Sequence, residues 1–142
     1  MPKNWYLGFK KQNLNTKVIY FSINYDGFFK FHPKHKDDQY VLNLFNKDQE
    51  SDKGIGQKAV GKNCSRIINK LFSKSHKTFV FDSSWDVSNN KKFQNMFIDF
   101  CENVLEKNKI SLDRWLDFRR ENIKKNKSKL FLRNKDFLAL KL

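Results

Sequence analysis

The spacing of apolar residues changes along this chain, and the change limits the folds available to it. Residues 17–25 (KVIYFSINY) and 28–32 (FFKFH) are rich in β-branched and aromatic residues, and Asp26-Gly27 lies between them. Asp-Gly between two such segments is a strong signal for a β-hairpin. One face of this predicted hairpin carries the rings of Tyr20, Phe29 and Phe31.

Further along, short apolar segments alternate with segments of helical spacing. Residues 5–9, 39–45 and 77–82 predict strands, although 39–45 also fits a helical turn. Residues 60–72 and 93–105 repeat apolar side chains every three or four positions, which predicts helices, and another helix is expected after Ser111. The tail, residues 129–142, predicts a second hairpin around a polar centre at 133–136.

Strands that precede segregated helices are typical of the α+β class. We therefore expect an N-terminal antiparallel sheet of about three to five strands, including the Asp26-Gly27 hairpin, packed against about three helices. A chain of 142 residues predicts a single domain over residues 1–142, and 39% hydrophobic residues suffice for a core.

The chain shows no pattern of membrane insertion or export. No apolar run approaches the roughly 18 residues of a membrane helix, and the N-terminus lacks an apolar stretch typical of a secretion signal. These features predict a soluble, cytoplasmic protein. The two cysteines, Cys64 and Cys101, fall at apolar helical positions and are expected to be buried thiols.

Net charge is the strongest global signal for function. Lys and Arg number 29 against 15 acidic residues, which gives a net charge of +14 and a pI near 9.8. Such a charge attracts polyanions, and nucleic acid is favoured over a membrane surface because no lipidation motif is present. The alternative is that abundant Lys and Asn reflect an AT-rich genome, although this explains the shortage of acids less well.

Residues 54–71 (GIGQKAVGKNCSRIINKL) contain parts of two phosphate-binding patterns. Gly56, Gly61 and Lys62 match G-x-x-x-x-G-K, but a P-loop requires Ser or Thr next, and Asn63 stands there. Gly54-Ile55-Gly56 followed by Arg66-Ile67-Ile68 resembles the second half of a helix-hairpin-helix. That resemblance implies a helix N-terminus that binds a DNA phosphate.

The same stretch departs from the helix-hairpin-helix pattern at two places. Residues 47–53 lack the periodicity of a first helix, and Val60 occupies the usual alanine position. A simpler interpretation is that the glycines end a loop, residues 46–56, and a helix then begins.

Basic residues recur every fourth position through this predicted helix. Five cations four residues apart form a ridge with no acid between Lys53 and Asp82, a pattern suited to binding phosphates. A later segment is also basic, although neighbouring acids can neutralise part of it. The predicted nucleic-acid contacts are Lys58, Lys62, Arg66, Lys70, Lys74, Arg119, Arg120, Lys124, Lys125, Lys127 and Lys129.

Aromatic side chains extend this prediction to bases. Tyr20, Phe29 and Phe31 would stack on unpaired bases if helices cover the other face of the sheet. The alternative is that these rings belong to the hydrophobic core or to a dimer interface.

Candidate catalytic groups are few. His32 and His35 form the one histidine pair, without further ligands nearby in sequence. Four acids were considered as a magnesium site for phosphodiester hydrolysis: Asp82, Asp86, Asp99 and Glu102. No nucleophile motif accompanies them. We therefore predict no catalytic residues, no metal and no cofactor.

The main hypothesis is a small, non-catalytic protein that binds nucleic acid, with RNA or single strands favoured. A second hypothesis is an inhibitor or accessory protein from a phage or mobile element that docks on a ribonucleoprotein, for example a CRISPR effector. A third is a metal-dependent nuclease. Exposed aromatic strands also allow a homodimer.

Overall fold

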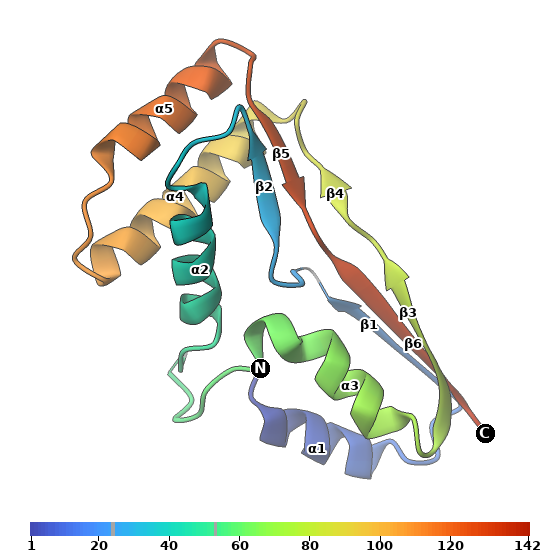
Figure 1. Ribbon diagram of the computed structural model, residues 1–142. Helices are drawn as coiled ribbons and strands as arrows, with labels where there is room; N and C mark the ends of the chain where they lie inside the picture. Colours follow the sequence, from blue (N-terminus) through green and yellow to red (C-terminus); the bar gives the residue numbers. More distant parts are fainter. Residues whose placement is uncertain (24, 53) are drawn as a thin grey trace. The chain divides into compact units, whose positions relative to one another are not determined.

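The protein has an α+β fold with two antiparallel sheets (Figure 1). The computed structural model describes residues 1–23, 25–52 and 54–142. Contacts divide the chain into two compact units: unit 1 comprises Met1–Gly27, Gln49–Ser84 and Arg133–Leu142, and unit 2 comprises Phe28–Asp48 and Trp85–Leu132. Each unit joins segments that are distant in sequence. The expectation of one domain over residues 1–142 stays a prediction.

Unit 1 is built on a three-stranded sheet in the order β1-β6-β3. Its strands are β1 (Val18–Ile23), β6 (Lys135–Lys141) and β3 (His76–Asp82), and β6 pairs antiparallel with both neighbours. Helices α1 (Lys3–Gln12) and α3 (Cys64–Phe72) pack on one face, and a 3₁₀ turn, η1 (Gly61–Asn63), leads into α3.

The core of unit 1 follows from alternation along the strands and helical spacing in α3. Ile19, opposite Ala139, and Phe137 project toward the helices and are buried. The buried core consists of Tyr6, Ile19, Val60, Ile68, Phe72, Phe137 and Ala139, with Phe9, Phe21, Cys64, Ile67 and Leu71 packed against it. The apolar stripe predicted for residues 60–72 is therefore the buried side of α3.

Unit 2 contains the second sheet, in the order β2-β5-β4. Its strands are β2 (Phe29–His32), β5 (Lys129–Leu132) and β4 (Trp85–Asp86), and its helices are α2 (Asp38–Gln49), α4 (Lys91–Lys107) and α5 (Asp113–Lys124). Asn90 caps α4 by accepting a hydrogen bond from the backbone N–H of Phe93. The apolar stripe of α4 is buried at Phe97, Cys101, Val104 and Leu105, as its spacing predicts, whereas Met96 and Phe100 are exposed.

Two segments expected as strands are helical. Residues 5–9 lie in α1 and residues 39–45 lie in α2, for which a helical turn was the alternative. Short apolar segments fit a buried helical face as well as a strand, so periodicity alone does not separate the two. In α1, Tyr6 and Phe9 lie three residues apart and reach the same core.

Both predicted hairpins are wrong, although their strands exist. β1 pairs with β6 and β2 pairs with β5, so Asp26-Gly27 connects strands of different sheets. The tail forms β5 and β6, which also belong to different sheets. The residues that were predicted to form hairpin turns instead connect a strand of one sheet to a strand of the other.

Asp26 has an ion-pairing role in place of the expected turn role. Its side chain is 5% exposed and forms ion pairs with Lys135 Nζ at 2.8 Å and with Arg133 Nε at 3.2 Å. The hydroxyl of Ser65 donates to it at 3.0 Å. The polar centre of the tail therefore neutralises a buried carboxylate, since an unpaired buried charge is costly.

Gly27 permits a close approach to the start of α3. Its φ is +76°, and a Cβ there would lie 2.4 Å from the Cβ of Lys62. Any side chain at this position would clash with Lys62, and the residue that carries it would have a strained backbone conformation. Glycine is thus required here for packing, and not for a two-residue hairpin turn.

Candidate nucleic-acid interface

The loop before α3 does not form the predicted phosphate-binding turn. Helical structure begins at Gly61, five residues after Gly56, and α3 itself begins at Cys64. The Asp52 carboxylate accepts hydrogen bonds from the backbone N–H groups of Gly54 at 3.0 Å and Ile55 at 2.9 Å. Because a carboxylate of the chain already occupies these donors, the helix-hairpin-helix resemblance carries no phosphate site here.

The simpler interpretation of residues 54–71, a loop ended by glycines, fits the structure better. Gly54 and Gly56 both have positive φ, and Asp52 forms an isolated bridge with Lys58. The G-x-x-x-x-G-K match does not have the geometry of a P-loop either, because Gly61 and Lys62 lie inside η1. A P-loop instead wraps phosphates before its helix begins.

The cations of α3 do form an exposed ridge. We call Lys62, Arg66, Lys70 and Lys74 the α3 ridge; all four are exposed. Lys62 lies in η1, Arg66 and Lys70 lie in α3, and Lys74 follows the C-cap. The opposite side of the helix is buried in the core, so these side chains point away from the sheet.

Few acids neutralise the α3 ridge. Lys62 Nζ lies 3.9 Å from Glu50 Oε1, with both side chains solvent-accessible, and Arg66 Nη2 donates to Asn63 Oδ1 at 3.1 Å. Over residues 1–23, 25–52 and 54–142, no ion pair within 4.0 Å joins Arg66, Lys70 or Lys74 to a carboxylate. Lys58 is also exposed but precedes the helix, so it does not share the ridge spacing.

The later basic segment is largely a structural element, and Arg119 is the clearest correction. Its side chain is fully buried, and its guanidinium donates to Asp38 Oδ1 and to the carbonyl of Pro33 at 2.6 Å. It stacks 4.7 Å from the Phe31 ring. Burial lowers the pKa of Arg119, and Asp38 opposes that shift. Arg119 ties α5 to α2 and β2 and cannot contact a ligand.

Two further members of this segment are paired with acids. Arg120 donates to Glu102 at 2.6 Å and to Asp99 at 3.1 Å, which raises the pKa of Arg120. Lys125 pairs with Glu121 one helical turn away. Lys124, Lys127 and Lys129 are exposed, and none has a carboxylate ion pair among the residues that the structure describes. These three remain candidates for binding phosphates.

Phe29 and Phe31 are core residues, as the alternative interpretation held. They are 4% and 2% exposed, and Phe29 packs edge-to-face on Phe97 at 5.0 Å. Strand alternation points them toward the helices of unit 2. They cannot stack on bases. Tyr20 is 58% exposed, and its hydroxyl donates to Asp136, which raises the pKa of Tyr20.

Tyr20 lies on a sheet face that carries several rings. In β3, Phe79 and Phe81 project to the same side as Tyr20, and their rings lie parallel at 6.1 Å. Lys77 Nζ lies 5.5 Å above the Phe79 ring. We define the unit 1 open face by this side of the sheet: Val18, Tyr20, Phe79, Phe81, Leu138 and Leu140.

The α3 ridge and the unit 1 open face lie on opposite sides of unit 1. Helix α3 covers the face of the sheet that carries Ile19, Phe137 and Ala139, whereas Tyr20, Phe79 and Leu138 project from the other face. Cations of the ridge and rings of the open face therefore cannot contact the same nucleotide. Phe79 and Phe81 were not among the residues predicted to bind nucleic acid, although their spacing of two within residues 77–82 indicates that they share one face of a strand.

Unit 2 has a surface on which a ring of the central strand and several cations share one face. Phe131 of the central strand β5 lies between Lys30 of β2 and Asp86 of β4, and His32 faces Lys129 in the adjacent row. We define the Phe131 face as Phe28, Lys30, His32, Asp86, Ser88, Lys129 and Phe131. These residues line an open hollow of about 590 Å³.

The acids considered for a magnesium site serve other roles. Asp99 and Glu102 both bind Arg120. Asp82 accepts a hydrogen bond from the backbone N–H of Ser84 at 2.9 Å, which contributes to lowering the pKa of Asp82. Within residues 1–23, 25–52 and 54–142, no three His, Cys, Asp or Glu side chains form a group suited to a metal ion.

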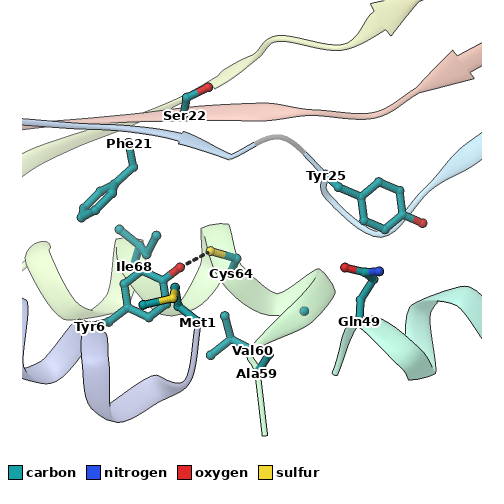
Figure 2. Close-up of a pocket in the computed structure, with 11 residues that line it drawn as sticks. Met1, Tyr6, Phe21, Ser22, Tyr25, Gln49, Ala59, Val60, Cys64 and Ile68 are labelled. Atoms are coloured by element: carbon teal, nitrogen blue, oxygen red, sulfur yellow. Dashed lines mark hydrogen bonds between the residues drawn. The ribbon is translucent and has the colours of Figure 1, made fainter. Parts of the chain in front are cut away.

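A second hollow, of about 230 Å³, lies inside unit 1 (Figure 2). The Tyr6 hydroxyl and the Cys64 thiol meet there at 3.1 Å. Burial raises the pKa of both groups, so neither is ionised near neutral pH. A protonated, half-buried thiol is a poor nucleophile. Val60, Ile68 and Phe21 of the lining belong to the core of unit 1 or pack against it.

The comparisons with known proteins assign no family. No protein-family model matches the chain, and no curated protein compared with it is significantly similar. Among the described residues, no helix has the length and apolar character needed to span a membrane.

Proposed function

We propose that this protein is a non-catalytic nucleic-acid-binding protein whose α3 ridge contacts backbone phosphates. The observation that carries the proposal is the row of four exposed cations, of which Arg66, Lys70 and Lys74 have no acidic partner among the described residues. Like charges four residues apart each cost a few tenths of a kcal/mol in a helix. A polyanion bound along the ridge would offset that cost.

The distribution of charge supports the same conclusion. Unit 1 holds 14 of the 29 basic residues but 5 of the 15 acidic residues, whereas unit 2 holds 15 and 10. Unit 1 is therefore the more strongly positive part of the chain, although it contains only about half of the residues. A field of this kind steers a polyanion toward the ridge and raises its association rate at low salt.

The proposed contacts are those members of the predicted set that are exposed and lack strong acidic partners: Lys58, Lys62, Arg66, Lys70, Lys74, Lys124, Lys127 and Lys129. Contacts to phosphates position a nucleic acid but carry no sequence information. We therefore expect the ridge to bind without sequence preference.

A titration at two salt concentrations tests the proposal. Four phosphate contacts from the ridge give a slope of log affinity against log salt of about −3, because each contact contributes roughly 0.7–0.9. Between 50 and 200 mM salt, affinity for a random-sequence oligonucleotide should therefore fall by roughly 50- to 150-fold. Unmeasurable binding at low salt, or an affinity that does not depend on salt concentration, would refute the proposal.

A second candidate function rests on the unit 1 open face. Val18 and Tyr20 are 57% and 58% exposed, and Phe81 is 47% exposed. Exposed apolar patches of this kind are typical of surfaces that bind other proteins. A protein that docks on a ribonucleoprotein as an inhibitor or accessory factor would use this face for protein and the α3 ridge for RNA.

The two candidates differ in how binding responds to RNase. The second candidate would be favoured if the protein retained a ribonucleoprotein after RNase treatment. Phe81→Glu should then abolish this retention, whereas Arg66→Gln should not. Retention that RNase abolishes, with equal sensitivity of wild type and Phe81→Glu, would favour the first.

A homodimer and a cytoplasmic location stay predictions. The unit 1 open face is where a second copy would bury apolar surface, since it is the exposed side of a sheet with unpaired edges at β1 and β3 among the described residues. Nuclease activity remains the enzymatic alternative, tested by incubation with labelled DNA and RNA plus magnesium, against Asp82→Ala.

A further inference from the structure

The Phe131 face combines three features that occur together nowhere else in the described chain: an exposed ring on a central strand, flanking cations and a hollow. Phe131 is 39% exposed, so its side chain is partly covered and partly faces solvent. It lies on β5, between β2 and β4, and is therefore held by strands on both sides. A ring fixed in this way presents a flat apolar surface at little cost in conformational entropy.

Cations flank the ring on the same face. Lys30 is directly opposite Phe131 in the β2–β5 pair, and His32 is directly opposite Lys129 one row along. Side chains paired across neighbouring strands have Cβ atoms about 4.5–5.5 Å apart. Lys30 and Lys129 are exposed. Lys30 across the strand pair and Lys129 two residues along β5 place two cations on the face of the ring, which suits a ligand with an aromatic part and neighbouring negative charges.

Asp86 supplies a hydrogen-bond acceptor at the third strand. It is opposite Phe131 in the β4–β5 pair, and Ser88 donates to its Oδ1 from both the hydroxyl and the backbone N–H. These bonds, with Lys129 nearby, lower the pKa of Asp86 and keep it ionised at neutral pH. A carboxylate repels phosphate but accepts a hydrogen bond from the amino group of a base.

The size of the hollow agrees with a small planar group. Its volume of about 590 Å³ falls within the roughly 300–1,000 Å³ of ordinary ligand sites. The hollow is open to solvent, so a chain can enter and leave it. Duplex DNA or RNA would not fit this chemistry, because its bases are stacked on each other and present no free face.

We propose that the Phe131 face binds unpaired bases of single-stranded nucleic acid. Phe131 stacks on a base, and Lys30 and Lys129 pair with the flanking phosphates. Asp86 accepts a hydrogen bond from the amino group of the base, which favours cytosine over uracil. The inference rests on the proposed function and specifies which form of nucleic acid the protein takes and where.

The first experiment measures binding of unlabelled wild type and variants to fluorescent oligonucleotides by anisotropy. Probes are a 12-residue oligo(C), a 12-residue oligo(U) and a duplex of equal length. Phe131→Ala should weaken oligo(C) binding by about 5- to 150-fold, the loss expected for one stacked base, and leave duplex binding within twofold. Phe100→Ala is the matched control, since Phe100 is 49% exposed on α4 and lies outside the face.

A tryptophan variant provides a readout that does not depend on affinity. Phe131→Trp should bind as well as wild type, and oligo(C) should quench the added fluorescence, measured as the difference from wild type with its own Trp5, Trp85 and Trp115. Stacking of a base on the indole causes this quenching. Binding without quenching in the folded variant would overturn the inference, even if Phe131→Ala failed to fold.

The outcomes separate the inference from the proposed function. Wild type that binds no probe refutes both. Wild type that binds all probes, is weakened by Arg66→Gln and is unaffected by Phe131→Ala refutes the inference alone. Oligo(C) should bind roughly 3- to 10-fold more tightly than oligo(U) because of one hydrogen bond to Asp86. Equal affinities in wild type, or a preference unchanged in Asp86→Ala, which removes the acceptor, would overturn the role of Asp86.

Discussion

Arg66→Gln should weaken nucleic-acid binding and stabilise the protein at the same time. Arg66 is exposed in the first turn of α3, with Lys62 and Lys70 four residues away on either side. A cation near a helix N-terminus opposes the helix dipole at a cost of about 0.3–1 kcal/mol. Each like-charged neighbour four residues away adds about 0.2–0.5 kcal/mol. Gln retains helix propensity and length, so little else changes.

The expected gain in folding free energy is about 0.7–2 kcal/mol, less the contribution of the exposed hydrogen bond from Arg66 to Asn63. For a chain of this size, a gain of 1 kcal/mol raises Tm by about 2–4 °C. Loss of one phosphate contact should lower affinity at 0.1 M salt by about 5- to 8-fold and reduce the magnitude of the salt slope by roughly 0.7–0.9.

The assay combines thermal melts with anisotropy titrations at four salt concentrations. Arg114→Gln is the matched control, because Arg114 is also exposed in the first turn of a helix but lies in α5, outside the proposed contacts. Its binding should equal that of wild type. If Arg66→Gln left affinity and salt slope unchanged, or lowered Tm, the view of the α3 ridge as a phosphate-binding surface would be refuted.

Three other substitutions or modifications have clear expected outcomes. Arg119→Met should destabilise the protein by about 3–5 kcal/mol in urea unfolding, since it leaves the Asp38 carboxylate without its buried partner; a loss below 1 kcal/mol would contradict that role. Gly27→Ala should cost about 1–3 kcal/mol because of its positive φ and the clash with Lys62, and an unchanged Tm would count against the close approach. Cys101, whose pKa burial raises, should resist iodoacetamide at pH 8 in the native protein and react once urea unfolds it; rapid native labelling, followed by mass spectrometry, would show that the thiol is accessible.

Helices with a long apolar stripe could be predicted from the sequence, and short ones could not. Residues 93–105 repeat apolar side chains over several turns, and α4 forms there with part of that stripe buried. Residues 5–9 are too short for periodicity to decide, and packing of Tyr6 against the unit 1 core gives α1. The strand at residues 77–82 was also predictable, but not which of its faces would be left uncovered.

Strand pairing could not be read from local signals. Asp26-Gly27 has the composition of a tight turn, yet the buried Asp26 carboxylate binds Lys135 and Arg133 from the far end of the chain. Those partners are more than one hundred residues away, so no local pattern reports them. As a result, Phe29 and Phe31 were assigned to the wrong face of their sheet, and Phe131 was not singled out.

The sequence by itself determined the net charge and the four-residue spacing of Lys62, Arg66, Lys70 and Lys74, and the proposed class of partner is inferred from these properties. Tertiary structure decided which cations are available. Arg119 and Arg66 are both predicted from the sequence to be nucleic-acid contacts, but one is buried against Asp38 and the other faces solvent. The physical reason is that burial and ion pairing depend on which elements pack together, and packing is set by contacts between residues distant in the chain.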